Sequence, residues 1–345
     1  MRYRQRASKA VSPWISDSDY THGGEVVCGL RHVYRGVWGC PAWAAGKPCS
    51  YCFLGKTVRG KKALLEGVAW IDCDCSDHRP REWACDGGDC LGLTIDNARA
   101  AVTKWLRGAD CSFSRSCRLK CSRSDRCDQF NPMPAILNAG EYTDSLAWTP
   151  EENPHLGMLL DLFSDPLTNP YGHKLLLASK GGLEATKAHL EGRQPSPNVI
   201  LSWSIGNLGE DAEPHWLPAF YPGSRLVAAD WMLLDGWRVR LRLDPLGPGH
   251  DWQADVRQYA TTTIAHFVPQ KQHPLPELIT LGTLRHNGGR VKLPADERVG
   301  IYREAIDGLR QGGYMGDIGL CKETPDMIHK ILGIEPHEMR CNCLP

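Results

Sequence analysis

The feature of this 345-residue sequence that most constrains its fold is a regular alternation of apolar and amphipathic segments after residue 133. Six short apolar segments have the length of buried strands, at residues 134–140, 173–180, 198–206, 237–246, 277–284 and 316–323. Segments with helical periodicity lie between most of them, at residues 155–163, 183–192, 224–236 and 296–313. Strand, helix and strand in alternation predict a parallel sheet with crossover helices. The sequence therefore predicts an α/β fold, an open (βα)6-type partial TIM barrel, with its chemistry at the C-terminal ends of the strands.

The rest of the chain divides by composition. Residues 1–22 are basic and show no clear periodicity, which predicts a loosely held N-terminal arm, either a solvated tail or a contact for phosphates. Residues 25–38 predict a first strand. We expect the barrel to span residues 23–345, interrupted by a cysteine-rich insertion at 60–128 and closed by a cysteine-containing tail at 321–345.

Charge and hydropathy exclude several classes of protein. Hydrophobic residues make up 42% of the chain, which is enough for a sizeable core. Basic and acidic residues balance at 40 each, so any contact with nucleic acid must come from a local patch. We expect a cytoplasmic protein without a membrane span, because no apolar run approaches the roughly 20 residues that a span requires. Its 15 cysteines then indicate metal binding more than disulfides.

Three cysteines lie close together in the loop at residues 37–57. Cys40, Cys49 and Cys52 have the spacing C-x8-C-x2-C, and Tyr51 precedes the last of them. Three thiolates in one loop would hold three irons of a [4Fe-4S] cluster and leave the fourth iron open for a reaction. A zinc knuckle and buried structural cysteines are the alternatives at this point.

Eight further cysteines lie at residues 73–127 in two groups of four, separated by an amphipathic helix predicted at 93–108. Each group could bind zinc or an auxiliary Fe–S cluster. Basic residues surround the second group and indicate either a nucleic-acid contact or a solvated metal loop. In the tail, Thr324 and Gly333 are the predicted cap and stop of a helix. Cys321, Cys341 and Cys343 would furnish another set of metal ligands or close the barrel structurally.

The strand at residues 237–246 has arginine at every second position. Arg238, Arg240 and Arg242 alternate with apolar residues, and period two places all three on one face of the sheet. This face either lines the barrel as a cationic wall for phosphate or carboxylate, or belongs to a solvated edge strand.

Several motifs resemble the radical S-adenosylmethionine (SAM) superfamily, and in particular its spore photoproduct lyase branch. CSYCFLGKT at 49–57 resembles the cluster loop, although the first gap is longer than the usual C-x3-C-x2-C. AGEYTDSL at 139–146, ASK at 178–180, SWSIGN at 202–207 and the run from 224 to 246 resemble the strand ends that contact SAM, in the same order. The resemblance implies that Cys40, Cys49 and Cys52 hold a [4Fe-4S] cluster. It implies that the following residues bind SAM: Tyr51, Thr143, Lys180, Ser204 and Arg225.

The resemblance also implies an activity. It predicts a radical SAM enzyme, of the isomerase or lyase type, that modifies a thymine-type base in DNA, for example by isomerising an aminoacyl-modified thymidine in phage DNA. A flavodoxin- or ferredoxin-type protein would supply electrons, in the host cytoplasm if the chain is viral. Glu141 stands where the lyase has its hydrogen-donating cysteine, and we expect it to bind an ammonium group or accept a proton. The alternatives are a radical SAM enzyme that acts on RNA or a peptide, and a non-catalytic, zinc-stabilised nucleic-acid-binding module.

Overall fold

The computed structural model describes most of the second half of the chain and short parts of the first. The described residues are 10–12, 15–18, 21–22, 25–26, 31–34, 36–37, 41, 95–107, 134–140, 143–206, 222–247, 252–267, 274–283, 285–286 and 291–343. The cluster loop, both four-cysteine groups and Glu141 lie outside them.

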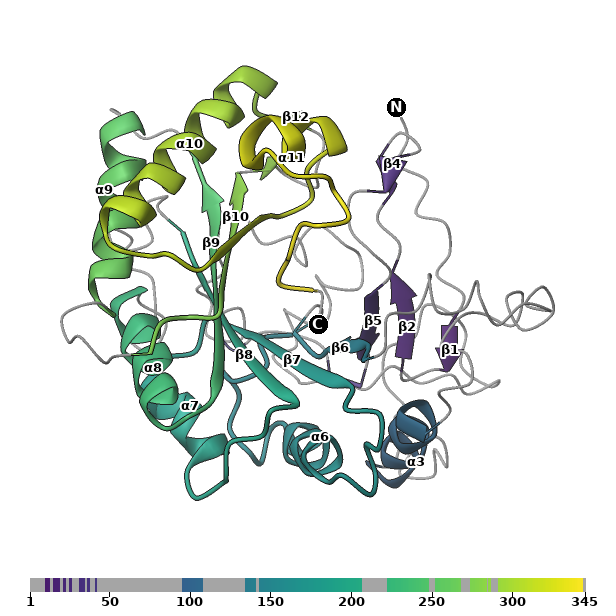
Figure 1. The fold of residues 1–345 in the computed structure, drawn as a ribbon. Helices are drawn as coiled ribbons and strands as arrows, with labels where there is room; N and C mark the ends of the chain where they lie inside the picture. The colour runs from purple at the N-terminus through teal and green to yellow at the C-terminus, as the bar shows by residue number, and fades with distance from the viewer. Residues whose placement is uncertain are drawn as a thin grey trace.

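A nine-stranded sheet with the order β1-β2-β5-β6-β7-β8-β9-β10-β13 forms the centre of the molecule (Figure 1). From β5 to β13 all neighbours are parallel, whereas β1 and β2 add an antiparallel edge. The strands are β1 (Ala10–Ser12), β2 (Ile15–Ser18), β5 (Arg31–Tyr34), β6 (Ile136–Asn138), β7 (Lys174–Ser179), β8 (Val199–Ile205), β9 (Arg238–Leu246), β10 (Leu278–Thr283) and β13 (Asp317–Leu320). Since β1 and β13 are the two edges of this sheet, the barrel is open, as predicted.

Helices line the outer side of the curved sheet (Figure 1). The helices are α3 (Ile95–Arg107), α6 (Pro154–Ser164), α7 (Leu183–Leu190), α8 (Pro222–Leu234), α9 (Trp252–Ala265), α10 (Ala295–Gln311) and α11 (Pro325–Leu332). Two small hairpins complete the described elements: β3 (Thr21–His22) with β4 (Glu25–Val26), and β11 (Arg285–His286) with β12 (Val291–Lys292). None of the helices in the described ranges combines the length and apolar character that a bilayer span demands.

The main core lies between the sheet and these helices. Leu241 and Leu243 of β9 are fully buried in it, together with Leu175 and Leu177 of β7. Residues one position along each strand face the inside of the curve instead. There Ile136, Leu176 and Ile200 form a separate small apolar cluster. Apolar residues therefore occupy both faces of the central strands, which explains their continuous hydrophobic runs.

The C-terminal tail turns back into the inside of the curve (Figure 1). Cys343 packs against the small inner cluster, and Ser202 of β8 donates a 3.0 Å hydrogen bond to Asn342 Oδ1. Gly319 of β13 allows this approach, because a Cβ at this position would lie 2.0 Å from the Arg340 carbonyl oxygen. The tail thus fills part of the interior.

Two predictions for the N-terminal half differ from the structure. Residues 10–22 of the predicted loose arm contain β1, β2 and β3, and β2 pairs with β5, because Ile15 reaches the main core. The predicted strand at 25–38 is divided into β4 and β5. Helix α3, placed by the sequence inside the insertion, packs Trp105 and Leu106 into the core and so belongs to the barrel itself.

The helix predicted in the tail is confirmed in its details. Thr324 Oγ1 accepts a 3.3 Å hydrogen bond from the Met327 N–H, and Pro325 occupies the first turn. Gly333 ends α11 with φ 69°, the left-handed conformation that glycine adopts without strain.

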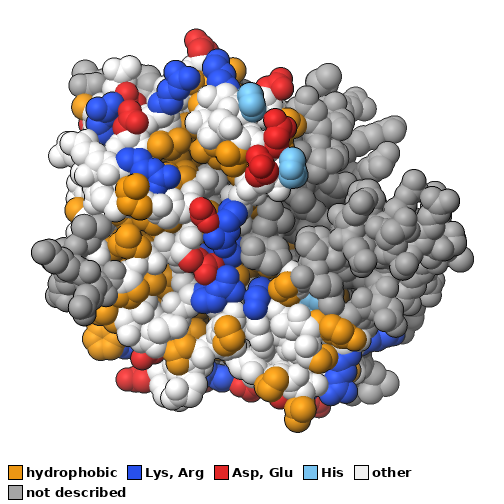
Figure 2. All heavy atoms as spheres, viewed as in Figure 1, with side chains coloured by type: hydrophobic (Ala, Val, Ile, Leu, Met, Phe, Trp, Pro, Cys, Tyr) orange, Lys and Arg blue, Asp and Glu red, His pale blue; other side chains and the backbone are white. Residues whose placement is uncertain are grey.

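On the face turned to the viewer in Figure 2, basic and acidic side chains lie next to one another in a central band. Described ion pairs of this kind include Arg340 with Asp317 at 2.5 Å and Arg238 with Glu277 at 2.9 Å. Among the described residues of this face, no large field of one sign is seen (Figure 2).

Candidate active site at the strand ends

Lys180 and Ser204 lie side by side where β7 and β8 end. The register pairs Ser179 with Trp203, so that the next residues along the chain, Lys180 and Ser204, are neighbours. Both side chains are partly exposed. A cation and a hydroxyl at neighbouring strand ends suit the carboxylate and ribose of SAM, so the residues present fit this cofactor.

Arg225 of α8 ties these two strand ends together. Its guanidinium is fully buried and donates to the Ser204 carbonyl at 2.8 Å and to the Lys180 carbonyl at 3.2 Å. The structure therefore gives Arg225 a backbone-holding position directly behind the two residues predicted to contact SAM. Its own contact with SAM stays a prediction.

Asp144 completes this network, and the sequence analysis did not single it out. Its buried carboxylate accepts hydrogen bonds from Ser179 Oγ at 2.5 Å, from the Lys180 N–H at 2.7 Å and from the Leu146 N–H at 3.3 Å. Burial raises the pKa of Asp144, and the bonds from Ser179 and Lys180 and the charge of Arg225 oppose this rise only in part. The available signal was the run AGEYTDSL at 139–146, which contains Asp144 and resembles a strand end that contacts SAM.

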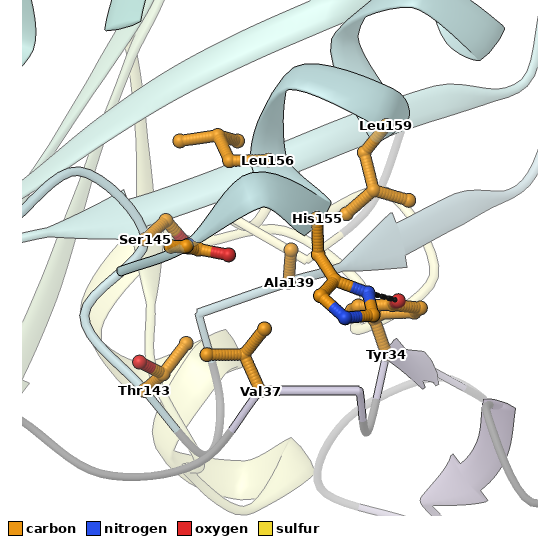
Figure 3. Close-up of a pocket in the computed structure, with 9 residues that line it drawn as sticks. Tyr34, Val37, Ala139, Thr143, Ser145, His155, Leu156 and Leu159 are labelled. Carbon is orange, nitrogen blue, oxygen red and sulfur yellow. Dashed lines mark hydrogen bonds between the residues drawn. The ribbon is translucent and has the colours of Figure 1, made fainter. Parts of the chain in front are cut away.

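Thr143 lines a small pocket together with Val37, Ser145 and His155 (Figure 3). Its hydroxyl accepts a 2.8 Å hydrogen bond from Trp148 Nε1. Opposite, the Tyr34 hydroxyl and His155 Nδ1 are 2.5 Å apart, and burial lowers the pKa of His155 to about 4. Within the described residues, the pocket has room for about one water molecule. The SAM contact predicted for Thr143 stays a prediction.

The arginine-bearing face of β9 lines the inside of the curve, because β9 lies between β8 and β10 rather than at an edge. Arg238 and Arg240 both bind Glu277, at 2.9 Å and 2.5 Å, and Arg240 also donates to the Asn342 carbonyl of the tail at 3.0 Å. The two bonds from Arg238 and Arg240 outweigh burial and lower the pKa of Glu277. The alternative of a solvated edge strand is therefore wrong. The part of the predicted cationic wall that Arg238 and Arg240 form is neutralised by the Glu277 carboxylate.

Several predicted site residues lie outside the described residues: Cys40, Cys49, Cys52, Tyr51 and Glu141. The structure does describe Val37, which follows β5 at the start of the cysteine loop and packs into the core. Among the described residues, no three His, Cys, Asp or Glu side chains converge as metal ligands. This holds for Cys321, Cys341 and Cys343 as well, and a metal site at these cysteines stays a prediction.

Comparison with known proteins supports the architecture. No family model and no curated protein matches the sequence. Spore photoproduct lyase complexed with dinucleoside spore photoproduct matches the structure with a TM-score of 0.50 and 13% identity, over 92% of this chain and 80% of that chain. A cysteine-to-alanine mutant of the lyase with the same dinucleoside gives a TM-score of 0.51 and 13% identity, over 88% and 78%.

The chain has the fold of spore photoproduct lyase. The open partial barrel predicted from the sequence is confirmed, and the resemblance of the motifs to the lyase branch agrees with the structural likeness. At 13% identity the likeness concerns the fold, so the reaction has to be argued from the residues of this chain.

Proposed function

We propose that this protein is a radical SAM enzyme that modifies a thymine-type base in DNA. The observation that carries the proposal is the network at the ends of β7 and β8. There Asp144 and Arg225 fix the backbone of Lys180 and Ser204, in a fold shared with a lyase that has been solved in complex with dinucleoside spore photoproduct.

The residues of the network have separate tasks in this proposal. Lys180 binds the carboxylate of SAM and Ser204 binds its ribose, while Asp144 and Arg225 hold both strand ends in place. Cys40, Cys49 and Cys52 hold the [4Fe-4S] cluster, which with SAM supplies a radical that abstracts hydrogen from the substrate. Preorganised binding groups of this kind keep a reactive intermediate close to its target.

The substrate that we propose is an aminoacyl-modified thymidine, and the reaction is an isomerisation rather than dimer repair. Glu141 supports this choice, because a carboxylic acid O–H is a poor hydrogen-atom donor compared with the thiol of the lyase. A carboxylate there can instead bind an amine or accept a proton. An electron donor of the flavodoxin or ferredoxin type completes the system.

The experiment is anaerobic reconstitution with iron and sulfide, followed by incubation with SAM, a reductant and DNA oligonucleotides. One oligonucleotide carries glycinyl-thymidine and another carries spore photoproduct. We expect 5′-deoxyadenosine, and a changed nucleoside only with the first oligonucleotide. Efficient repair of spore photoproduct would contradict the isomerase proposal, and zinc without iron in the purified protein would favour a non-catalytic binding module.

A matched pair of lysine variants tests the cofactor site. Lys180→Met should raise the dissociation constant of SAM about tenfold or more, because a charge-assisted hydrogen bond is lost. Lys187→Met is the control, since Lys187 lies over the Trp231 ring on the outer surface, 4.2 Å from its centre. Equal SAM binding by the two variants would remove Lys180 from the site.

A further inference from the structure

Arg242 and Asp244 form an accessible ion pair where β9 ends. Arg242 Nη2 lies 2.5 Å from Asp244 Oδ2, and the two side chains are 23% and 24% exposed. Arg242 also donates to Cys321 Sγ at 3.7 Å, from the last strand of the sheet. Both charges therefore lie inside the curve, at the same end of the sheet as Lys180 and Ser204.

The neighbouring strand is shaped to accept this pair. A Cβ on Gly282 of β10 would lie 2.6 Å from the Asp244 carboxyl carbon, so only glycine leaves room for the carboxylate there. Two residues earlier, Thr280 is 1% exposed, and its hydroxyl has no hydrogen-bond partner among the described residues. Thr280 pairs with Arg242 in the register and thus shares its face. A buried hydroxyl without a partner is costly, which indicates that a ligand completes it.

Arg242 lies at the same position along the sheet as the residues predicted to bind SAM. Ser204 pairs with Arg242 from the other side, and Lys180 is the next position along β7. A group bound by Arg242 and Asp244 would therefore lie next to the cofactor.

We propose that Arg242 and Asp244 bind a zwitterionic group of the substrate, an amine and a carboxylate on one carbon as in an amino acid. The Arg242 guanidinium binds the carboxylate of the substrate, and the Asp244 carboxylate binds its ammonium group. Each protein charge therefore exchanges its partner in the Arg242–Asp244 pair for a group of the substrate. This assignment rests on the proposed function and names the part of the substrate that the site selects.

The pair itself discriminates between ligands of different charge. A lone phosphate or carboxylate on Arg242 would lie beside the Asp244 carboxylate and be repelled by it, and a lone amine on Asp244 would be repelled by Arg242. A zwitterion meets both charges and leaves neither uncompensated. The chemistry therefore favours an aminoacyl group over a DNA phosphate.

The test measures binding without turnover, in the absence of reductant. Four short oligonucleotides differ at one base, which is glycinyl-thymidine, its methyl ester, its N-acetyl derivative or thymidine. We expect the wild type to bind the zwitterion about tenfold or more tightly than the other three. Arg242→Gln should lose the preference over the ester, and Asp244→Asn the preference over the N-acetyl form.

The control is Arg257→Gln, which removes one arginine from an exposed pair with Glu304 and should leave the preference intact. Thermal unfolding of each variant shows whether it is folded. Equal binding of the four oligonucleotides by the wild type, or an unchanged preference in both folded variants, would overturn the inference. A preference for the carboxylate alone would also overturn it, as an anion site.

The two proposals can fail separately. If the wild type releases 5′-deoxyadenosine but does not prefer the zwitterion, the inference fails and the proposed function stands. If it prefers the zwitterion but releases no 5′-deoxyadenosine after reconstitution, the proposed reaction fails and the binding site stands.

Discussion

Arg240 and Arg242 lie two residues apart on the same face of strand β9, with opposite consequences. The lower of the two, Arg240, is fully buried between Glu277 and the C-terminal tail. The upper one, Arg242, meets Asp244, and both side chains stay partly exposed. The described part of the tail explains the burial of Arg240, because the carbonyls of Cys341 and Asn342 accept hydrogen bonds from its guanidinium.

The difference shows how a barrel separates stability from chemistry. The alternation of side chains along a strand determines the face on which an arginine lies. Its position along the strand determines whether its partners are permanent. In parallel barrels the C-terminal ends of the strands carry the reaction, and the opposite end carries the fold. Each prediction below tests this division or makes it sharper.

The largest effect on the free energy of unfolding is expected at Arg240 of β9. Arg240→Ala removes one partner of a buried network and should lower the free energy of unfolding by about 3–5 kcal/mol. Arg242→Ala is the matched variant and should cost about 1 kcal/mol or less, because its pair is partly exposed. Denaturant unfolding measures both. Similar losses at the two positions would break the comparison.

Between pH 6.5 and 4, acid should destabilise the fold around His155 and His173. Burial lowers the pKa of His155 to about 4, and burial with the charges of His32 and Lys174 does the same for His173. The unfolded chain then binds more protons below pH 6.5, so stability is complete above pH 6.5 and falls as the pH drops to 4. The loss is about 3 kcal/mol for each imidazole.

His155→Gln should reduce the loss of unfolding free energy at acidic pH by the part that His155 contributes. His329→Gln should not reduce this loss, because the His329 side chain is 67% exposed. Unfolding free energies at pH 7 and pH 4.5 test the difference. An unchanged pH dependence in His155→Gln would show that this imidazole does not control the acid stability.

Docking of the tail depends on one glycine. Gly319→Ala places a Cβ 2.0 Å from the Arg340 carbonyl oxygen, which the tail can avoid only by moving. We expect a loss of about 1–3 kcal/mol. Gly223→Ala in α8 is the control, since its Cβ meets no atom within 4 Å and should stabilise the helix by up to about 1 kcal/mol. Equal stability of the two variants would mean that the tail does not hold this position.

A modest effect on stability is expected at Asp144, next to the ends of β7 and β8. Asp144→Asn weakens the hydrogen bonds to Ser179 and Lys180 and should cost about 1–2 kcal/mol. Its main effect should be on SAM, with a dissociation constant raised about tenfold because Lys180 is no longer held. Calorimetric titration with SAM tests this, and Asp161→Asn, in an exposed pair with Arg193, is the control. Unchanged SAM affinity in the folded Asp144 variant would remove it from the positioning network.

Sequence patterns predicted what depends on neighbouring residues. The strand and helix alternation, the cap of α11 by Thr324 and the shared face of the three arginines all follow from local periodicity. The places of Lys180 and Ser204 followed from motifs at strand ends.

The sequence did not reveal features that depend on contacts between distant residues. The burial of Asp144 against Ser179 and the insertion of the tail under Arg240 join segments 35 and 102 residues apart. The pairing of β2 with β5 depends on a register that two short polar strands do not specify. Periodicity identifies a face of a strand, but not what covers it.

The central claim is tested most directly by measuring 5′-deoxyadenosine released from SAM by the reconstituted, reduced protein. The account predicts release by the wild type and by Cys321→Ala, a cysteine of the last strand outside the proposed cluster. It predicts no release by Cys40→Ala, Cys49→Ala or Cys52→Ala, each of which removes a proposed iron ligand. Release by these three variants at the wild-type level would contradict the account.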